Sequence, residues 1–344
     1  MAGNGNAELL SVRGLAVSFA RDGGSRGEAR GPSGGPARAL RGIDLRVSER
    51  EIAALVGESG SGKTVTSTAI MGLLPTPPAT IDAGVIEFRG RNLLALSAEE
   101  RRRVRGRHIA MVFQEPSRYL NPAFRVGRQI TESLELHLGM ARREAQERAG
   151  ELCGLVGLPG ERALAAWPHE LSGGMKQRAM IAMAISCNPA LLIADEPTTA
   201  LDVTLQLQIL ELLLGLRDRL GMAILFISHD LRLVKTIADQ VAVLYAGRIV
   251  ESAPAAALYA RPLHPYTRLL LASIPSAARR GSRLRVIPGR VPDAQSVPGG
   301  CAFHPRCPQA EEACRTVAPE SRQFAEGSAS HTAACHLVGK PWQD

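Results

Sequence analysis

Residues 57–64 read GESGSGKT, and they follow the apolar run IAALV at residues 52–56. A helix-like segment comes next and runs through Ile70. This order of strand, glycine-rich loop, Lys-Thr and helix is typical of a loop that binds nucleotide phosphates. The glycines let several backbone N–H groups point at one spot, where the N-terminus of the next helix adds positive potential. The stretch predicts that the chain binds a nucleoside triphosphate.

The residue types in this loop suit separate tasks. Lys63 is expected to reach the β- and γ-phosphates, and Thr64 to offer its hydroxyl to Mg²⁺. A glycine turn that binds nothing is disfavoured, because every fixed position of the motif is present in the expected context. The predicted nucleotide-binding residues here are Gly57, Ser59, Gly60, Ser61, Gly62, Lys63 and Thr64.

Length and composition limit the classes of protein that fit. The 344 residues suit one large domain plus a smaller one. The net charge of +8 could indicate nucleic acid, but the basic residues are scattered, and we expect no nucleic-acid partner. The dense run RRRVRGR at 101–107 favours a solvated helix face or turn over an anionic contact. No apolar segment approaches the roughly 18 residues of a spanning helix, so we expect a soluble, cytoplasmic chain.

Apolar runs and helical periodicity alternate along the chain, which predicts an α/β fold with a parallel sheet core. A Gly- and Arg-rich stretch at 21–37 separates two strand-like segments and is expected to be a flexible, enlarged hairpin tip. A small helical subdomain is predicted at about 115–170. Strands are predicted at 8–19, 38–47, 109–113, 191–194 and 223–228, a closing hairpin at 241–250, and helices at 126–138 and 142–156.

A second anion-binding helix start is predicted at LSGGMKQR, residues 171–178. Ser172, Gly173 and Gly174 stand directly before a long helix-like segment, which is a favourable N-terminus for an anion. Two such sites in one nucleotide-binding chain imply that both address the same phosphates.

A carboxylate pair, Asp195-Glu196, ends the short apolar strand LLIA. The first acid can hold Mg²⁺ and the second can orient water. His229 follows the buried strand AILFIS and could contact the γ-phosphate, although a lone histidine there is more often structural. Phe19, at the end of the first strand, is either a packing residue or a residue that stacks on a base.

Taken together, these pieces resemble the nucleotide-binding subunit of an ABC transporter. The matching motifs are GESGSGKT at 57–64, VFQEP around Gln114, LSGGMKQR at 171–178, LLIADEP at 191–197, ALD at 200–202 and ISHD at 227–230. The resemblance implies a P-loop ATPase core with an antiparallel β subdomain, a helical subdomain and a small C-terminal extension. The domains expected are residues 1–260 for the nucleotide-binding part and 261–344 for the extension.

The resemblance also implies roles for individual residues. Glu196 would polarise the attacking water, Gln114 would bridge Mg²⁺ and water, and His229 would contact the γ-phosphate. Thr64 and Asp195 would organise Mg²⁺, and Phe19 stands where the family places its base-stacking aromatic. Ser172, Gly173 and Gly174 would close on ATP held by a partner subunit. The 21–37 insertion, close to Phe19, departs from the family pattern.

The C-terminal part narrows the subgroup. HPYTRLLL at 264–271 and PGG-CAFHPRCP at 298–308 resemble the extension of dipeptide and oligopeptide permease ATPases, and Met175 is familiar in their first ATPase subunit. This implies a homologous ATPase partner in a heterodimer, two membrane-spanning permease subunits and an extracytoplasmic solute-binding protein. The chain would lie peripherally at the cytoplasmic face of the cell membrane. Nickel or another small solute is an alternative cargo, and a soluble, non-transport ABC ATPase is a less favoured class.

Four of the six cysteines gather after residue 300. Cys301, Cys307, Cys314 and Cys335 are separated by five, six and twenty residues, without the close pair that zinc sites usually show. Disulfides are disfavoured in a reducing cytosol. Four irregularly spaced thiolates suit a [4Fe–4S] cluster, which the peptide-permease extension carries in some members. Zinc and free thiols stay open as alternatives.

Overall fold

The computed structural model describes residues 7–20, 35–199, 201–274, 286–326 and 329–340. Within these ranges the chain forms two compact units. The first is built mainly from Arg89–Ile227 together with Val47–Ile52, and the second from Leu10–Arg46, Ala53–Phe88 and Ser228–Asp344. The predicted flexible tip lies largely outside the described residues, as does Ala200 of the ALD motif.

The second unit begins with an antiparallel sheet. Strand β1 (Glu8–Phe19) lies between β2 (Ala37–Ser48) and β4 (Ala79–Phe88). The β1–β4 pairing is antiparallel and places Phe19 opposite Ala79. Apolar and polar residues alternate along β2, and its apolar face is buried. This confirms the antiparallel β subdomain implied by the resemblance.

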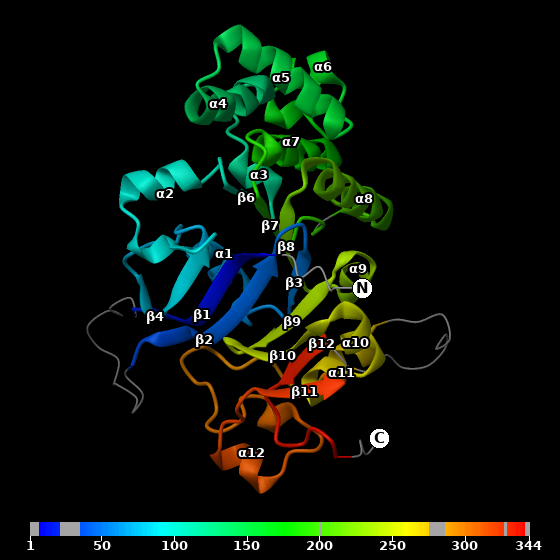
Figure 1. Ribbon diagram of the computed structural model, residues 1–344. Helices are drawn as coiled ribbons and strands as arrows, with labels where there is room; N and C mark the ends of the chain where they lie inside the picture. Colours follow the sequence, from blue (N-terminus) through cyan, green and yellow to red (C-terminus); the bar gives the residue numbers. More distant parts are fainter. Residues whose placement is uncertain (1–6, 21–34, 200, 275–285, 327–328, 341–344) are drawn as a thin grey trace, which may run out of the picture. The chain divides into compact units, whose positions relative to one another are not determined.

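A second sheet in this unit carries the phosphate loop (Figure 1). The buried strand β3 (Ile52–Val56) pairs in parallel with β9 (Gln240–Tyr245), which forms an antiparallel hairpin with β10 (Arg248–Pro254). The order then continues through β12 (Ala329–Ala333) to β11 (Arg322–Glu326). The predicted hairpin at 241–250 is therefore confirmed. The helices of this unit are α1 (Lys63–Ile70), α9 (Leu231–Ile237), α10 (Ala255–Ala260), α11 (Pro265–Ala272) and α12 (Glu312–Thr316), with a 3₁₀ turn at His304–Arg306.

The first unit is organised around three parallel strands. Strand β7 (Leu191–Asp195) lies between β6 (Ile109–Val112) and β8 (Ala223–Ser228), and all three are buried. Their near-continuous apolar sequence is what a parallel strand covered on both faces requires. The long helix α8 (Val203–Leu220) connects β7 to β8. Phe113 was predicted in the strand but lies just beyond β6.

Helices dominate the rest of the first unit, as predicted for about 115–170. Helix α4 (Val126–Leu138) packs against α5 (Arg142–Leu155) and α6 (Gly160–Ala165), and α7 (Gly173–Ile185) packs on α4 and α5 (Figure 1). Ile130, Leu134 and Leu152 are fully buried there. The remaining elements are α2 (Ala98–Val104), α3 (Pro116–Tyr119), β5 (Arg91–Asn92) and 3₁₀ turns at Leu93–Ala95 and Pro168–Glu170.

The arginine-rich run falls on and just after α2. Arg102 and Arg103 both lie within ion-pair distance of Glu99, one helical turn away, at 3.4 and 3.3 Å. These side chains are exposed, so the favoured interpretation of a solvated helix face is supported. Among the described residues, no helix combines the length and apolar character that crossing a bilayer requires.

Candidate functional site

The glycines of the phosphate loop are required by close backbone approach. A Cβ on Gly57 would lie 2.2 Å from the carbonyl oxygen of Leu244 in β9. Gly62 adopts a φ of 112° as the N-cap of α1, and its Cβ would lie 2.8 Å from Leu40 Cδ2. Any other residue at these positions would push the loop away from the sheet. The loop is thus held between β9 and β2 with its turn pointing into the start of α1.

Polar groups of the loop are arranged for an anion. Lys63 is 5% exposed, and its ammonium donates hydrogen bonds to the carbonyls of Gly57 and Glu58, at 2.8 and 3.2 Å. The Ser61 hydroxyl is buried and finds no hydrogen-bond partner among the described residues. Thr64 is exposed in the first turn of α1, while Ser59 and Gly60 form the exposed tip. A helix N-terminus, a buried ammonium and an unsatisfied hydroxyl fit the phosphates of a nucleotide.

The carboxylate pair lies at the end of β7. Asp195, the last strand residue, is 3% exposed, and Glu196 follows with a φ of 48°. Its backbone N–H donates to Ile227 in β8 at 3.0 Å, which fixes this unusual turn. One oxygen of the Glu196 carboxylate accepts from Gln114 Nε2 at 3.1 Å and from the Thr199 hydroxyl at 3.0 Å. The structure therefore brings Gln114 to Glu196, and the bridging of Mg²⁺ and water by Gln114 stays a prediction.

Thr199 was missed by the sequence reasoning. Its only signal is the run DEPTT at 195–199, in which a hydroxyl three residues after Glu196 can reach back to the carboxylate. Together with Gln114, it holds the carboxylate in one orientation. A general base must be oriented toward its water, so these two contacts are useful to a hydrolase.

The signature segment forms an exposed helix start in the first unit. Ser172 is the N-cap of α7, and its hydroxyl accepts from the Met175 N–H at 3.3 Å. Gly173 is exposed, whereas Gly174 is buried, with Leu205 Cδ2 3.3 Å from the position of a Cβ. The helix N-terminus predicted at this segment is thus present, and its contact with an anion stays a prediction.

His229 and Phe19 lie in the second unit with the phosphate loop, whereas Gln114, Asp195, Glu196 and Ser172 belong to the first. His229 is exposed directly after β8, and the next residue, Asp230, caps α9 by accepting from the Arg232 N–H at 2.9 Å. Phe19 is half-buried at the end of β1. Its base-stacking role stays a prediction.

The four late cysteines come close to one another. Burial raises the pKa of the Cys335 thiol to about 12, and the charges of Cys301, Cys307 and Cys314 add to that rise. Burial also raises the pKa of Cys307 to about 11. Among the described residues, however, no three His, Cys, Asp or Glu side chains are grouped so that they could hold a metal ion. The donor chemistry suits an iron–sulfur cluster, but the arrangement does not support it.

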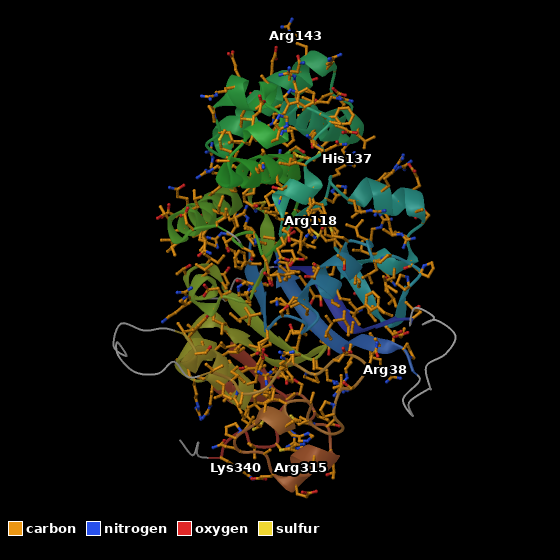
Figure 2. The ribbon with its side chains drawn as sticks, turned by 180° about the vertical axis from the view of Figure 1, so that it is seen from behind. Arg38, Arg118, His137, Arg143, Arg315 and Lys340 are labelled. Atoms are coloured by element: carbon orange, nitrogen blue, oxygen red, sulfur yellow. The ribbon has the colours of Figure 1, made fainter. Side chains whose placement is uncertain are left out.

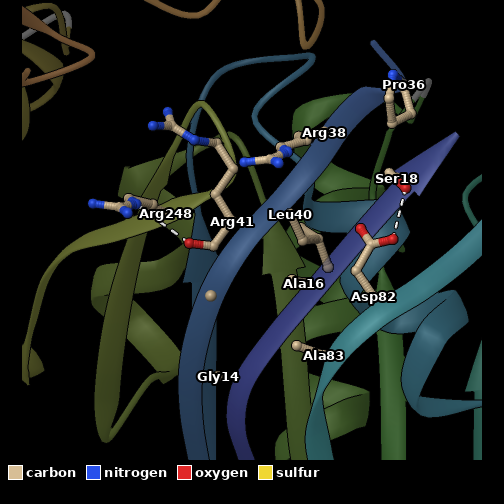
Figure 3. Close-up of a pocket in the computed structure, with 11 residues that line it drawn as sticks. Gly14, Ala16, Ser18, Pro36, Arg38, Leu40, Arg41, Asp82, Ala83 and Arg248 are labelled. Atoms are coloured by element: carbon tan, nitrogen blue, oxygen red, sulfur yellow. Dashed lines mark hydrogen bonds between the residues drawn. The ribbon is translucent and has the colours of Figure 1, made fainter. Parts of the chain in front are cut away.

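A pocket of about 560 Å³ opens on the antiparallel sheet (Figure 3). Three arginines lie along it, and burial followed by the charges of Arg248 and Arg38 lowers the pKa of Arg41. Asp82, its one acidic lining residue, accepts from the Ser18 hydroxyl at 2.9 Å. None of the residues 57–64 lines this pocket, so it is not where the phosphates are predicted to bind.

The chain is 51% identical over 300 residues to a probable peptide ABC transporter ATP-binding protein of Sinorhizobium fredii, covering 87% of this chain and 89% of that protein. It is 45% identical over 338 residues to the dipeptide transport ATP-binding protein DppD of Escherichia coli, covering 97% and 99%. The dimeric bacterial ABC transporter cassette MJ0796 matches with a TM-score of 0.62 at 24% identity, over 72% of this chain and 99% of that one, which shows the shared fold.

The phosphate loop on β3 and the acid pair on β7 define an α/β ATPase of the P-loop class. The family described as ABC transporter matches residues 40–199, and the oligopeptide/dipeptide transporter C-terminal region matches residues 250–314. The chain belongs to the ATP-binding proteins of the peptide ABC transporter family. The resemblance inferred from the motifs is thus confirmed, and so is the α/β fold class.

Proposed function

We propose that this ATPase energises the import of dipeptides or oligopeptides through a membrane permease. The observation that carries the proposal is the 45% identity to a dipeptide transport protein over nearly the whole of both chains, including the C-terminal region. That region follows the ATPase core and matches the family described as the C-terminal region of oligopeptide/dipeptide transporters.

In this proposal the residues of the chain divide the hydrolysis of ATP among them. Lys63 and the loop amides hold the phosphates, while Thr64 and Asp195 are the residues suited to hold Mg²⁺. Mg²⁺, when bound, neutralises charge on the phosphate oxygens. Glu196 polarises the attacking water in the orientation that Gln114 and Thr199 give its carboxylate. His229 contacts the γ-phosphate, and Phe19 stacks on the base.

The partner in hydrolysis is a homologous ATPase subunit. Ser172, Gly173 and Gly174 close on ATP held by that subunit, because the exposed start of α7 offers backbone N–H groups to an anion. ATP then acts as a removable link between two chains, and hydrolysis releases it.

The permease contact is placed at residues 115–135. Tyr119 and Phe124 are 52% and 51% exposed in this segment, and Tyr119 stacks on Phe113 with ring centroids 3.9 Å apart. Exposed aromatic side chains of this kind suit a buried contact with another protein. Two permease subunits would therefore hold the chain at the cytoplasmic face of the membrane, and an extracytoplasmic solute-binding protein would deliver the cargo.

A [4Fe–4S] cluster on Cys301, Cys307, Cys314 and Cys335 is part of the proposal. The donor chemistry of four thiols supports it, whereas their arrangement among the described residues is not that of a metal site. Its role would be to hold the extension together. Iron and sulfide are to be measured in anaerobically purified protein, beside a variant with all four cysteines changed to serine. About four iron atoms per chain support the cluster; stoichiometric zinc, or thiols without metal, contradicts it.

The transport proposal is tested by reconstituting the chain in vesicles together with the ATPase, permease and binding proteins that the neighbouring genes encode. We expect dipeptides or short oligopeptides, loaded on the binding protein, to stimulate ATP hydrolysis. Stimulation by nickel or another small solute instead would assign a different cargo. Robust hydrolysis with no dependence on any permease would contradict transport itself.

A further inference from the structure

The C-terminal extension contacts the phosphate loop directly. Arg306, from the segment CAFHPRCP, forms a two-pronged ion pair with Glu58, with Nη1–Oε2 at 2.7 Å and Nη2–Oε1 at 2.9 Å. Glu58 is the second residue of GESGSGKT, and 248 residues separate it from Arg306 in sequence. Both residues lie in the same compact unit.

Arg306 is fixed from several sides. Its side chain is 5% exposed, its Nε donates to the carbonyl of Pro288 at 2.8 Å, and its Nη1 lies 3.4 Å from the Tyr245 hydroxyl. The guanidinium also lies over the ring of Phe303, 5.9 Å from the centroid. A planar guanidinium held in this way pairs with a carboxylate in one geometry, unlike an exposed and mobile ion pair.

A second contact reaches the backbone of the same loop residue. The Glu58 N–H donates to the hydroxyl of Tyr266 at 3.0 Å. Tyr266 is fully buried in α11, and its ring packs against Tyr245 and Phe303 with centroids 4.6 and 5.2 Å away. An aromatic cluster built from β9 and the extension thereby positions both groups that hold Glu58.

The negative charge of the Glu58 carboxylate suggests what these contacts do for ATP binding. A carboxylate in a loop that binds a triphosphate repels the ligand, and Glu58 is close to where the phosphates are predicted to bind. The Lys63 ammonium, expected to reach those phosphates, hydrogen-bonds the carbonyl of Glu58 itself at 3.2 Å. The Arg306 guanidinium cancels the charge of the carboxylate while tying it to the buried cluster.

We infer that Arg306 and Tyr266 are positioning residues through which the C-terminal extension orders the phosphate loop and neutralises Glu58 for ATP binding. The inference concerns ATP affinity alone and does not depend on the transported solute. It also gives the extension a task in the ATPase site, distinct from any contact with a permease.

The test measures the Kd of the full-length chain for Mg²⁺-bound fluorescent ATP, with Arg306→Met and Glu58→Gln as single and double variants. We expect Arg306→Met to raise Kd about tenfold or more, because it leaves the Glu58 charge uncompensated. Adding Glu58→Gln should restore most of the affinity, since the repelling charge is gone. The deficit of Arg306→Met should also shrink at about 1 M salt, where charges are screened.

Arg315→Met is the matched control. Arg315, labelled in Figure 2, lies in the same extension with its side chain 61% exposed and pairs weakly with Glu312 at 3.7 Å. Its Kd should stay that of the wild type. If Arg306→Met binds ATP as tightly as the wild type, the inference is wrong. If the double variant binds ATP no more tightly than Arg306→Met alone, the ion pair is only a structural contact, and the inference that Arg306 neutralises Glu58 is wrong.

Two milder variants keep the test usable if Arg306→Met unfolds. Arg306→Lys retains the charge but loses the two-pronged geometry, so we expect an intermediate Kd. Tyr266→Phe removes only the hydroxyl that accepts from Glu58, and should raise Kd about threefold to tenfold with little change in kcat. A fall in kcat at unchanged KM for Tyr266→Phe would contradict a role in binding.

Discussion

Acidification should weaken the fold of this protein through one histidine. His264 is 1% exposed, and burial lowers its pKa to about 4 from an ordinary value of 6.5, against a smaller opposing effect of the Glu251 charge. Its Nδ1 accepts from the Tyr266 N–H at 3.0 Å and so caps α11. Its Nε2 is buried with no hydrogen-bond partner in the described part of the chain. The folded state therefore holds this ring neutral.

The direction of this pH effect on stability depends on whether the folded or the unfolded chain takes up the proton first. As pH falls through 6.5, the unfolded chain protonates His264 while the folded chain does not, so stability is lost until about pH 4 and is constant below it. With these two pKa values, the free energy of unfolding should fall by about 2 kcal/mol between pH 7 and pH 5 and by about 3 kcal/mol down to pH 4. Above pH 7 the contribution is complete.

The assay is urea unfolding of the full chain at pH 7 and pH 5, beside His264→Asn. Asparagine can cap α11 by accepting the same N–H but does not titrate. We expect the wild type to lose about 2 kcal/mol more than the variant between the two pH values. Equal losses would refute the assignment to His264.

Three further predictions concern the general base Glu196, the phosphate-loop residue Gly57 and the buried carboxylate of Glu251. Glu196→Gln should keep ATP binding but reduce ATP turnover at least a hundredfold in the assembled transporter, because it replaces the proton-accepting carboxylate that Gln114 and Thr199 orient with an amide. Near wild-type turnover would exclude Glu196 as general base. Gly57→Ala should raise the Kd for ATP in equilibrium titrations more than tenfold, because the new Cβ would lie 2.2 Å from a backbone carbonyl oxygen. The control Gly150→Ala places its Cβ in open space on α5 and should bind ATP like the wild type. Glu251→Ala should lower the free energy of unfolding by about 3–5 kcal/mol, because the buried carboxylate accepts from two backbone N–H groups at 2.7 and 2.9 Å and from His331. In urea unfolding, a loss below about 1 kcal/mol would mean that water takes the place of the carboxylate as hydrogen-bond acceptor.

Local patterns predicted the elements that carry the motifs. The strands at 52–56 and 223–228 and the helix at 126–138 have the predicted bounds, because continuous apolar runs and 3.6-residue periodicity are written in adjacent residues. The motifs assigned Gln114 and Glu196 to the same reaction but did not predict the hydrogen bond between their side chains, which lie 82 positions apart in the sequence.

What escaped prediction depends on residues far apart in sequence. Nothing near Arg306 indicates that its guanidinium lies on Glu58, and nothing near Thr332 indicates pairing with Ser252 in β10. Such contacts are set by tertiary packing, which neither propensity nor periodicity contains. Phe303 and Cys314 are likewise buried within the extension.

The place of β12 has a consequence for shortening this chain. Strand β12 covers β10 by pairing Ala333 with Glu251 and Thr332 with Ser252, and the Ala334 N–H donates to the Val250 carbonyl at 2.8 Å. A chain that ended before Arg322 would leave the backbone donors and acceptors of β10 as an open edge. Open edges recruit strands from other molecules, so such a truncation should aggregate even with every ATPase motif intact. Strand β12 of the C-terminal extension therefore also prevents self-association through the edge of β10.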